Sequence, residues 1–219
     1  MDNTIIEIKQ ATKKIGNKII LDEISLNFER GMIHGIVGRN GAGKTMLMKS
    51  ICGLMRLTSG SIRVGETTLN EQSEFIPENI GIVIESPGFL PQFSGWKNLK
   101  FLAGIQNKVS DEQILHSLEI VGLTHAKDLK VSGYSMGMRQ RLGLAQAFME
   151  QQKILILDEP MNGLDNQGVQ DMRTLLLELK ESGRTILLAS HTQEDIRILC
   201  DTVVELDHGK VISQEILSK

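Results

Sequence analysis

Short, uniformly apolar runs that end in polar residues are the clearest pattern along the chain. Three such runs cover residues 32–37, 153–157 and 185–189. Runs this short and this apolar are typical of strands buried on both faces of a parallel sheet. The polar residues that follow them are a glycine-rich loop, then Asp158-Glu159, then Ser190-His191. Because ligands bind at the carboxyl ends of the strands in such sheets, the pattern predicts one site built from these residues.

Helical periodicity lies between the second and third runs. Leu175, Leu176 and Leu179 share one face of a helix. Asn166 is a candidate N-cap for this helix, and Gly183 fits the position just after its end. A strand, a helix and a strand joined by short links form a βαβ unit, which predicts an α/β fold with a parallel sheet.

Two other regions resemble antiparallel hairpins. Residues 62–69 form one of them, and residues 202–212 form the other, with Asp207-His208-Gly209 as its turn. The middle of the chain is instead mostly helical by pattern, including a helix over 111–121 with Ser110 as its cap. This helical block separates the first strand and loop from the second strand, so it is predicted to be an insertion. The expected organisation is a single domain over 1–219, with its core in 1–87 and 151–219 and a helical subdomain in 88–150.

Composition narrows the class of protein without naming an activity. The 219 residues are 41% hydrophobic and 23% charged, as in an ordinary soluble chain of one domain or slightly more. A net charge of −3 gives no electrostatic footprint for nucleic acid. No apolar run approaches the roughly 20 residues of a membrane span, and the first residues lack a secretory pattern, so a cytoplasmic location is expected. With 21 glycines and only 4% aromatic residues, the chain favours sites built from backbone.

Residues 38–45 match the phosphate-binding pattern Gly-x4-Gly-Lys-Ser/Thr between a predicted strand and a predicted helix over 45–54. The glycines allow backbone N–H groups to surround phosphate oxygens, and the helix N-terminus adds partial positive charge. Lys44 is expected to bind the β- and γ-phosphates, and Thr45 to offer its hydroxyl to Mg²⁺. The nucleotide-binding residues predicted here are Gly38, Arg39, Asn40, Gly41, Ala42, Gly43, Lys44, Thr45 and Met46.

Adjacent carboxylates end the second apolar run. Asp158 is expected to hold Mg²⁺, directly or through water. Glu159 points the other way and is placed to polarise an attacking water, which favours hydrolysis over transfer to a second substrate. His191, directly after the third run, is placed to sense the γ-phosphate and orient that water. We therefore predict Lys44, Glu159 and His191 as the catalytic residues.

A serine-glycine segment precedes another predicted helix. Ser135 can cap this helix, and Gly137 lets a phosphate approach its first turn. Taken alone, the segment is an ordinary helix cap.

Together these motifs resemble the ATP-binding subunit of ABC (ATP-binding cassette) transporters over essentially the whole chain. The motifs found in that family's order and spacing are the phosphate loop, Tyr134-Ser135-Met136-Gly137-Met138, the Asp158-Glu159 strand, Gly163-Leu164-Asp165 and His191. The resemblance implies an α/β P-loop NTPase fold with a RecA-like core, an antiparallel β subdomain and an inserted helical subdomain. It also implies ATP hydrolysis, with ATP and Mg²⁺ as cofactors.

The resemblance implies partners as well. Ser135 and Gly137 would bind the γ-phosphate of an ATP held by a second ATPase subunit. The two subunits would form a head-to-tail homodimer or heterodimer with Asp165 at the interface. An integral membrane permease would be a separate subunit and would hold this chain on the inner face of the cell membrane. No nucleic-acid partner is expected.

Three features depart from the common family pattern. The serine-glycine segment has Tyr134, Met136 and Met138 where Leu, Gly and Gln are usual. Glu85 stands where a Gln usually follows a strand; its carboxylate can ligate Mg²⁺ but adds negative charge beside the phosphates. Ile15 aligns with the aromatic residue that stacks on adenine, which predicts aliphatic contact with the base and weaker base discrimination.

The Glu85 and Tyr-Ser-Met-Gly-Met variants resemble the exporter branch that includes bacitracin-resistance and lantibiotic-immunity ATPases. The expected function is therefore an ATPase subunit that powers export, of a peptide antibiotic or another drug, through a separate permease. The loop 88–96 carries the only Trp, Trp96, and either contacts the permease or packs locally.

Two rival functions remain at this stage. A non-transport ABC ATPase, such as a cluster-assembly subunit, is the alternative within the family. A nucleotide-dependent switch or a small kinase is the rival from another class. A GTPase needs Asn-Lys-x-Asp to recognise guanine, and the segment 107–110 has Ser110 at the last position. A kinase needs neither the serine-glycine segment nor a switch histidine such as His191.

Overall fold

The computed structural model describes residues 3–73, 76–85, 88–106 and 108–217. Asn107, the first residue of the segment compared with the guanine motif, lies outside the described residues. The helices and strands are β1 (Thr4–Ile15), β2 (Lys18–Glu29), β3 (Ile33–Val37), α1 (Lys44–Ile51), β4 (Ser59–Val64), β5 (Thr67–Leu69), β6 (Ile80–Val83), α2 (Gly95–Gln106), α3 (Asp111–Ile120), α4 (Met136–Phe148), β7 (Ile154–Asp158), α5 (Asn166–Glu181), β8 (Thr185–Ala189), α6 (Gln193–Leu199), β9 (Thr202–Asp207) and β10 (Lys210–Ile216).

The three apolar runs of the sequence form neighbouring strands of a six-stranded sheet. Its strand order is β10-β9-β3-β8-β7-β6, and every pair except β10-β9 is parallel. Strand β7 shows why the runs are uniformly apolar. Leu155 and Leu157 belong to the core cluster formed with the lower helices. Ile154 and Ile156 belong to the core cluster on the other face of the sheet. The predicted α/β fold with a mostly parallel sheet is therefore confirmed.

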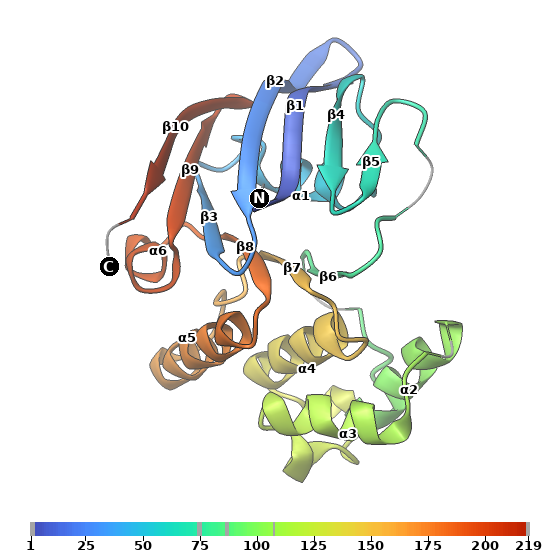
Figure 1. The fold of residues 1–219 in the computed structure, drawn as a ribbon. Coiled ribbons are helices and arrows are strands. Elements are labelled where there is room, and N and C mark those ends of the chain that lie inside the picture. Colours follow the sequence, from blue (N-terminus) through green and yellow to red (C-terminus); the bar gives the residue numbers. More distant parts are fainter. Residues whose placement is uncertain (1–2, 74–75, 86–87, 107, 218–219) are drawn as a thin grey trace.

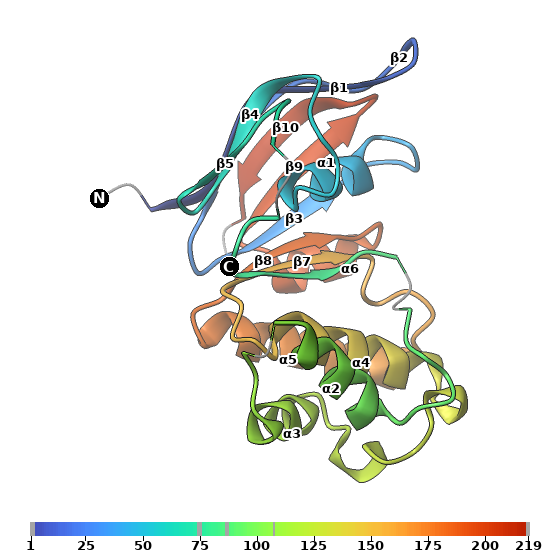
Figure 2. The same ribbon diagram turned by 90° about the vertical axis from the view of Figure 1, so that its right-hand side faces the viewer.

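A second, antiparallel sheet covers the upper face of the first (Figures 1 and 2). Its strand order is β2-β1-β4-β5, and helix α1 packs into the core cluster shared by the two sheets. The hairpin predicted over 62–69 is the β4–β5 pair, and the one predicted over 202–212 is the β9–β10 pair. The long β1–β2 hairpin has no counterpart in the sequence predictions. It brings the start of β2 toward the phosphate loop.

Helices α2, α3 and α4 gather below the parallel sheet, beside α5 (Figure 1). The middle of the chain is thus mostly helical, as its pattern predicted. Ser110 caps α3 as predicted, accepting a hydrogen bond from the backbone N–H of Gln113. Among the described residues, no helix is long and apolar enough to cross a lipid bilayer.

Two predicted helix boundaries were wrong by one to three residues. Helix α1 ends at Ile51 rather than continuing to 54, because Gly53 takes a left-handed conformation with φ of 72°. The N-cap of α5 is Asp165, not Asn166, because the Asp165 carboxylate accepts a hydrogen bond from Gly168 N–H at 2.8 Å.

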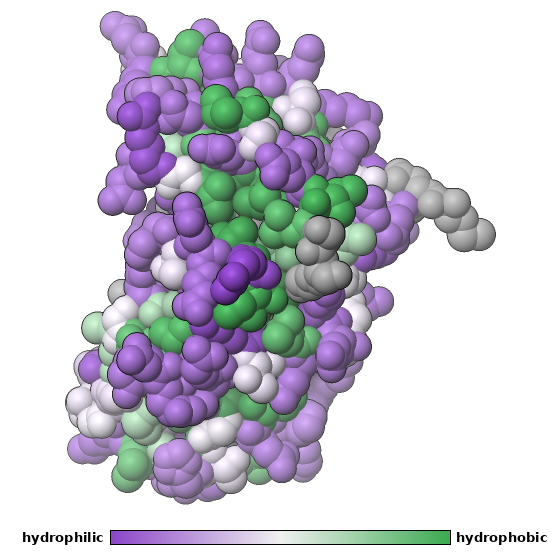
Figure 3. Space-filling model, turned by 90° about the vertical axis from the view of Figure 1, so that its left-hand side faces the viewer, coloured by the Kyte–Doolittle hydropathy of each residue, from purple (hydrophilic) through white to green (hydrophobic). Residues whose placement is uncertain are grey.

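Strand β10 is an edge of the six-stranded sheet and carries apolar side chains toward solvent. Ile212 is 59% exposed and Ile216 is 87% exposed. Figure 3 shows apolar surface, in green, in the middle of the face on which β10 and α6 lie. Lys210 and Glu215 on the same strand are also exposed, and such charges oppose edge-to-edge pairing between chains.

His34 is a buried histidine in β3 that should make stability depend on pH. Its Nε2 lies 2.8 Å from the Glu29 carbonyl oxygen, and its Nδ1 lies 2.7 Å from the Thr202 hydroxyl oxygen. A neutral ring satisfies both contacts, donating from Nε2 and accepting at Nδ1. Burial lowers the pKa of His34 below its ordinary value of 6.5. The neutral form is therefore favoured more strongly in the folded state than in the unfolded chain.

We expect the free energy of unfolding to fall as the pH drops below about 6.5, since the unfolded chain then binds a proton that the fold resists. Chemical denaturation at a series of pH values measures this slope. His34→Gln should flatten it, whereas His125→Gln at an exposed position should leave it unchanged. Equal slopes in wild type and His34→Gln would contradict the assignment.

Candidate active site

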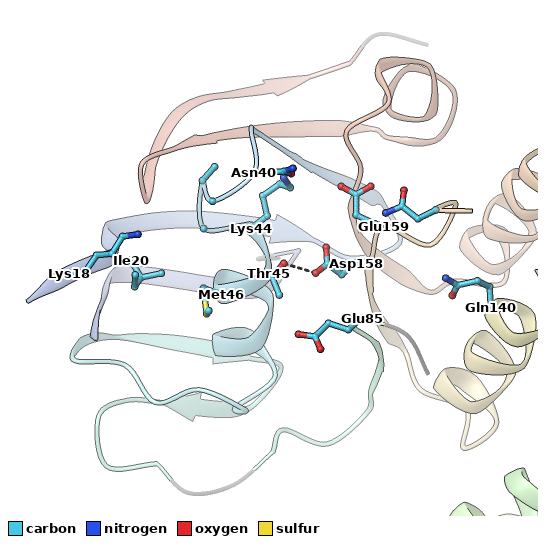
Figure 4. Close-up of a pocket in the computed structure, with 14 residues that line it drawn as sticks. Lys18, Ile20, Asn40, Lys44, Thr45, Met46, Glu85, Gln140, Asp158 and Glu159 are labelled. Carbon is cyan, nitrogen blue, oxygen red and sulfur yellow. Dashed lines mark hydrogen bonds between the residues drawn. The ribbon is translucent and has the colours of Figure 1, made fainter. Parts of the chain in front are cut away.

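A pocket of about 560 Å³ lies at the carboxyl ends of β3 and β7, where the strand pattern predicted a site. The residues that line it are Lys18, Ile20, Asn40, Gly41, Ala42, Gly43, Lys44, Thr45, Met46, Glu85, Gln140, Asp158, Glu159 and Asn162 (Figure 4). Seven of them belong to the predicted phosphate loop and the residue after it.

The phosphate loop joins β3 to α1 and depends on its glycines. Gly38 has φ of 144°, and a side chain there would overlap the carbonyl oxygen of Leu206. Gly43 is the N-cap of α1, with φ of 109°. Both are conformations that L side chains rarely adopt. The first N–H groups of any α-helix have no partner within the helix, and the first residues of α1 line the pocket, so this end of the helix is suited to bind an anion.

Lys44 lies against its own loop. The residue is only 7% exposed, and its ammonium donates a hydrogen bond to the Gly38 carbonyl at 2.7 Å. This contact holds a positive charge inside the loop, where phosphate oxygens would meet it.

Thr45 and Asp158, two of the predicted metal ligands, are in direct contact. The Thr45 hydroxyl donates a hydrogen bond to Asp158 Oδ2 at 2.6 Å, from the first turn of α1 to the end of β7 (Figure 4). The structure therefore places a hydroxyl and a carboxylate side by side at the phosphate loop. Oxygen donors of this kind suit Mg²⁺.

Glu159 and His191 also meet, because β7 and β8 are neighbours in the sheet. Glu159 Oε2 lies 2.8 Å from His191 Nδ1. The backbone of Glu159 has φ of 53°, which is strained for a residue other than glycine, and its N–H donates to the Ala189 carbonyl. The fold thus holds the backbone of Glu159 in an unusual conformation at the pocket, and its carboxylate is a group that can accept a proton from water.

Glu85, the third predicted metal ligand, lines the pocket and pairs with a lysine. Its Oε1 lies 2.7 Å from Lys49 Nζ, in the last turn of α1. The hydrogen bond and charge of Lys49 lower the pKa of Glu85 below its ordinary 4.5. The extra negative charge expected beside the phosphates is therefore offset by a neighbouring cation.

Arg39 points away from the pocket lining and toward the β9–β10 turn. Its guanidinium donates two hydrogen bonds to the Asp207 carboxylate, at 2.7 and 3.0 Å, and lies 2.6 Å from His208 Nε2. Neither Gly38 nor Arg39 lines the pocket that contains Lys44 and Asp158; both border a neighbouring cavity that His191 also lines. Arg39 therefore anchors the start of the phosphate loop to a distant turn.

Ser135, Gly137 and Asp165 lie outside the pocket of their own chain. Ser135 caps α4 as predicted, accepting from Met138 N–H at 3.2 Å. The segments carrying these residues touch each other, because a side chain on Gly163 would overlap the sulfur of Met136. They form one surface rather than part of the phosphate pocket.

Ile15 is half exposed at the end of β1, where it pairs with Lys18, and it does not line the pocket. Lys18 and Ile20 line the pocket instead, at the end away from Glu159 (Figure 4). Sequence reasoning missed both, although their i, i+2 spacing places them on one face of a strand. It also missed Gln140, which lies three residues after Gly137 on α4.

Trp96 packs against neighbouring residues but is only partly buried, so its contact with a permease stays a prediction. It is partly buried against the lower core, and Lys100 Nζ lies 4.6 Å from its ring centroid. Nearby, Phe101 makes an edge-on contact with Phe93 yet remains 49% exposed. Phe101 therefore also presents aromatic surface on α2.

Comparison with known proteins agrees with this geometry. The ABC transporter family model matches residues 21–162. The chain is 44% identical to the ABC transporter ATP-binding protein YybJ of Bacillus subtilis (strain 168), covering 96% of each chain. It is 38% identical to the bacitracin transport ATP-binding protein BcrA of Enterococcus faecalis, covering 98% of this chain and 70% of BcrA. It is 36% identical to the lantibiotic transport ATP-binding protein SrtF of Streptococcus pyogenes, covering 96% and 90%.

A solved structure shows the same fold. The protein cbiO1 of Clostridium perfringens, part of the ABC transporter complex cbiONQ, aligns with a TM-score of 0.87 at 28% identity, covering 98% of this chain and 89% of cbiO1. These matches favour a transport ATPase over the alternative of a cluster-assembly subunit. The chain therefore belongs to the ABC transporter family, as an ATP-binding subunit that hydrolyses ATP.

Proposed function

We propose that this chain powers the export of a peptide antibiotic through a separate integral membrane permease. The relatives named for bacitracin and lantibiotic transport support this substrate class. One observation supports the mechanism above all others. Residues 40–46, the Thr45–Asp158 pair and Glu159 line one pocket, and His191 lies 2.8 Å from Glu159, whereas Ser135 and Asp165 lie outside the pocket.

In this proposal different residues bind the phosphates, activate the attacking water and contact the base of ATP. Residues 38–46 bind the phosphates, with Lys44 on the β- and γ-phosphates. Glu159 accepts a proton from the attacking water, and His191 orients Glu159 through their 2.8 Å contact. Ile20 and Lys18, with Ile15 beside them, contact the base through aliphatic surface.

Mg²⁺ fits the residues present. No group of three or more His, Cys, Asp or Glu side chains suited to a metal ion occurs in the described part of the chain. Mg²⁺ typically takes one or two carboxylates and completes its shell with water and substrate phosphates. We propose that Thr45 and Asp158 hold the ion, with Glu85 reaching it through water or directly. When bound, the ion supplies neutralisation of charge on the phosphates.

Glu85→Gln tests the role of this carboxylate. Gln keeps the size of Glu85 but loses its charge and weakens the bond to Lys49. We expect hydrolysis to persist, with half-maximal activity moved to a several-fold different Mg²⁺ concentration, because Mg²⁺ is bound partly by charge. ATPase activity titrated with Mg²⁺ measures this shift. A profile identical to wild type would remove Glu85 from the metal site.

Two further subunits complete the proposal. A second ATPase subunit, placed head to tail, brings its own Ser135, Gly137 and Asp165 surface to the ATP held here. The permease would contact the groove between the core and the lower helices. That groove has about 340 Å³ and is lined by Leu54, Ile82, Gly88 and Gln146 among others. Leu54 in this groove is an exposed apolar side chain, and Phe101 of α2 is another exposed apolar side chain. Such docking would hold the chain at the cytoplasmic face of the membrane.

Co-purification tests the proposed function. The tagged chain, isolated from detergent-solubilised membranes, should carry with it an integral membrane protein with several apolar spans. ATP hydrolysis by the complex should rise when a bacitracin- or lantibiotic-type peptide is added. Recovery of soluble cluster-assembly proteins, with no membrane protein, would instead support the alternative within the family.

A further inference from the structure

A buried ion pair lies behind the Glu159–His191 contact and takes no part in the chemistry described above. Arg173 of α5 and Asp195 of α6 have side chains only 4% and 3% exposed. Arg173 Nε lies 2.8 Å, and one terminal nitrogen 2.5 Å, from Asp195 Oδ1. Both residues line a cavity of about 310 Å³ whose other walls include Glu159 and His191.

A serine hydroxyl connects this pair to the backbone around His191. Ser190 is 3% exposed, and its hydroxyl donates to Asp195 Oδ2 at 3.2 Å. Ser190 Oγ also accepts a hydrogen bond from the backbone N–H of Thr192 at 3.1 Å. The residues before and after His191 are thus bonded to one hydroxyl, which Asp195 holds. The His191 side chain is largely exposed, so few surrounding side chains restrain it. The hydrogen bonds of Ser190 and Thr192 restrain its backbone instead.

Arg173, the other member of the pair, connects it to the helix that begins at the surface expected at the dimer interface. Arg173 lies in α5, the helix capped by Asp165. The pair therefore joins the helix that starts at Asp165 to the turn that carries His191.

Stability alone does not explain a pair of this kind. Removing two charges from water costs free energy, and well-packed apolar residues of similar size often serve as well or better. A buried pair with fixed hydrogen bonds instead allows few alternative alignments of the two helices that carry it. The effect of such a pair is to fix the position of nearby groups, and the group nearest to this pair's hydrogen bonds is the turn that carries His191.

We propose that Arg173 and Asp195 are positioning residues that set His191 relative to Glu159 and couple it to the helix of Asp165. This inference rests on the proposed role of His191 in hydrolysis.

Five variants of the purified chain test it by steady-state ATPase assays. Asp195→Asn should lower kcat by about 10- to 100-fold, because small displacements of a catalytic group have effects of this size. The KM for ATP should stay within about twofold, since the phosphate loop is untouched. Glu194→Gln is the matched control. It removes the exposed carboxylate that also contacts Arg173, at 3.0 Å, and should leave kcat nearly unchanged.

The double variant Arg173→Met/Asp195→Leu separates position from stability. It should fold with a melting temperature close to wild type, because an apolar pair can replace a buried ion pair. Its kcat should nevertheless fall as in Asp195→Asn. A well-folded double variant with wild-type kcat would overturn the inference.

His191→Ala supplies the last comparison. If Asp195 acts through His191, Asp195→Asn should cause no further loss of kcat in the His191→Ala background. A full additional loss there would overturn the inference. If His191→Ala is slow but Asp195→Asn has the wild-type rate, the inference is overturned while the proposed role of His191 stands. A wild-type rate for His191→Ala would remove the role of His191 as well.

Discussion

Glu159→Gln is expected to lower kcat for ATP hydrolysis by about 10²- to 10⁴-fold while ATP still binds, the range associated with loss of a general base. Gln has the shape of Glu159 and can still meet His191, but it cannot accept a proton from water. The phosphate loop, Lys44 and the Thr45–Asp158 pair are unchanged by this substitution. The Glu159→Gln variant should therefore bind ATP normally but hydrolyse it very slowly.

The same variant should accumulate as an ATP-bound dimer. If ATP binding closes the dimer and hydrolysis reopens it, blocking only hydrolysis leaves the closed form populated. Gel filtration with and without Mg²⁺-ATP, beside single-turnover hydrolysis, measures both effects. Glu181→Gln, at the exposed end of α5, is the control and should behave as wild type. Normal turnover by Glu159→Gln would end the assignment of Glu159 as the base.

The sequence predicted the centre of the fold because burial on both sheet faces leaves a strong signal. Strand β8 was predicted at its observed bounds, Thr185–Ala189, since each of its residues is buried. Strand β1 left no such signal, because register shifts along it interrupt the alternation of buried and exposed residues. Strand β6 has four residues and includes Gly81, where a side chain would overlap the Ala147 carbonyl. Too few residues remain there for a periodic pattern.

The site divides in the same way. The phosphate loop is contiguous, so its spacing alone located it. The Glu159–His191 contact followed from the order of polar residues at adjacent strand ends, which a parallel sheet brings together. The Arg39–Asp207 pair joins residues 168 positions apart through a turn that contacts the loop. Only the packing of β9–β10 against the loop establishes that pair, and no local pattern encodes it.

Mixed dimers should recover activity that neither of two variants has alone. Lys44→Ala removes charge-assisted hydrogen bonds to phosphate, each worth about 1.5–3 kcal/mol, and should abolish most hydrolysis. Gly137→Asp should be equally inactive, because it places a carboxylate where the γ-phosphate of a partner's ATP is proposed to bind. The fold should accept this aspartate. A Cβ at Gly137 would make only ordinary contact with Leu164, and acidic residues suit the first turn of a helix.

A head-to-tail pair of this chain predicts the recovery. In a dimer of one Lys44→Ala and one Gly137→Asp chain, both defects fall in one composite site and leave the other intact. Random mixing should restore up to about a quarter of the wild-type rate, because half of the dimers then carry one working site of two. Gly137→Asn has the same size without the charge, and should be much less inhibited because it does not repel phosphate. ATPase assays over a range of mixing ratios should peak near equal amounts. A mixture no more active than its parts would contradict head-to-tail pairing of two copies, since only that arrangement brings the Ser135–Gly137 surface of one chain to the phosphate loop of the other.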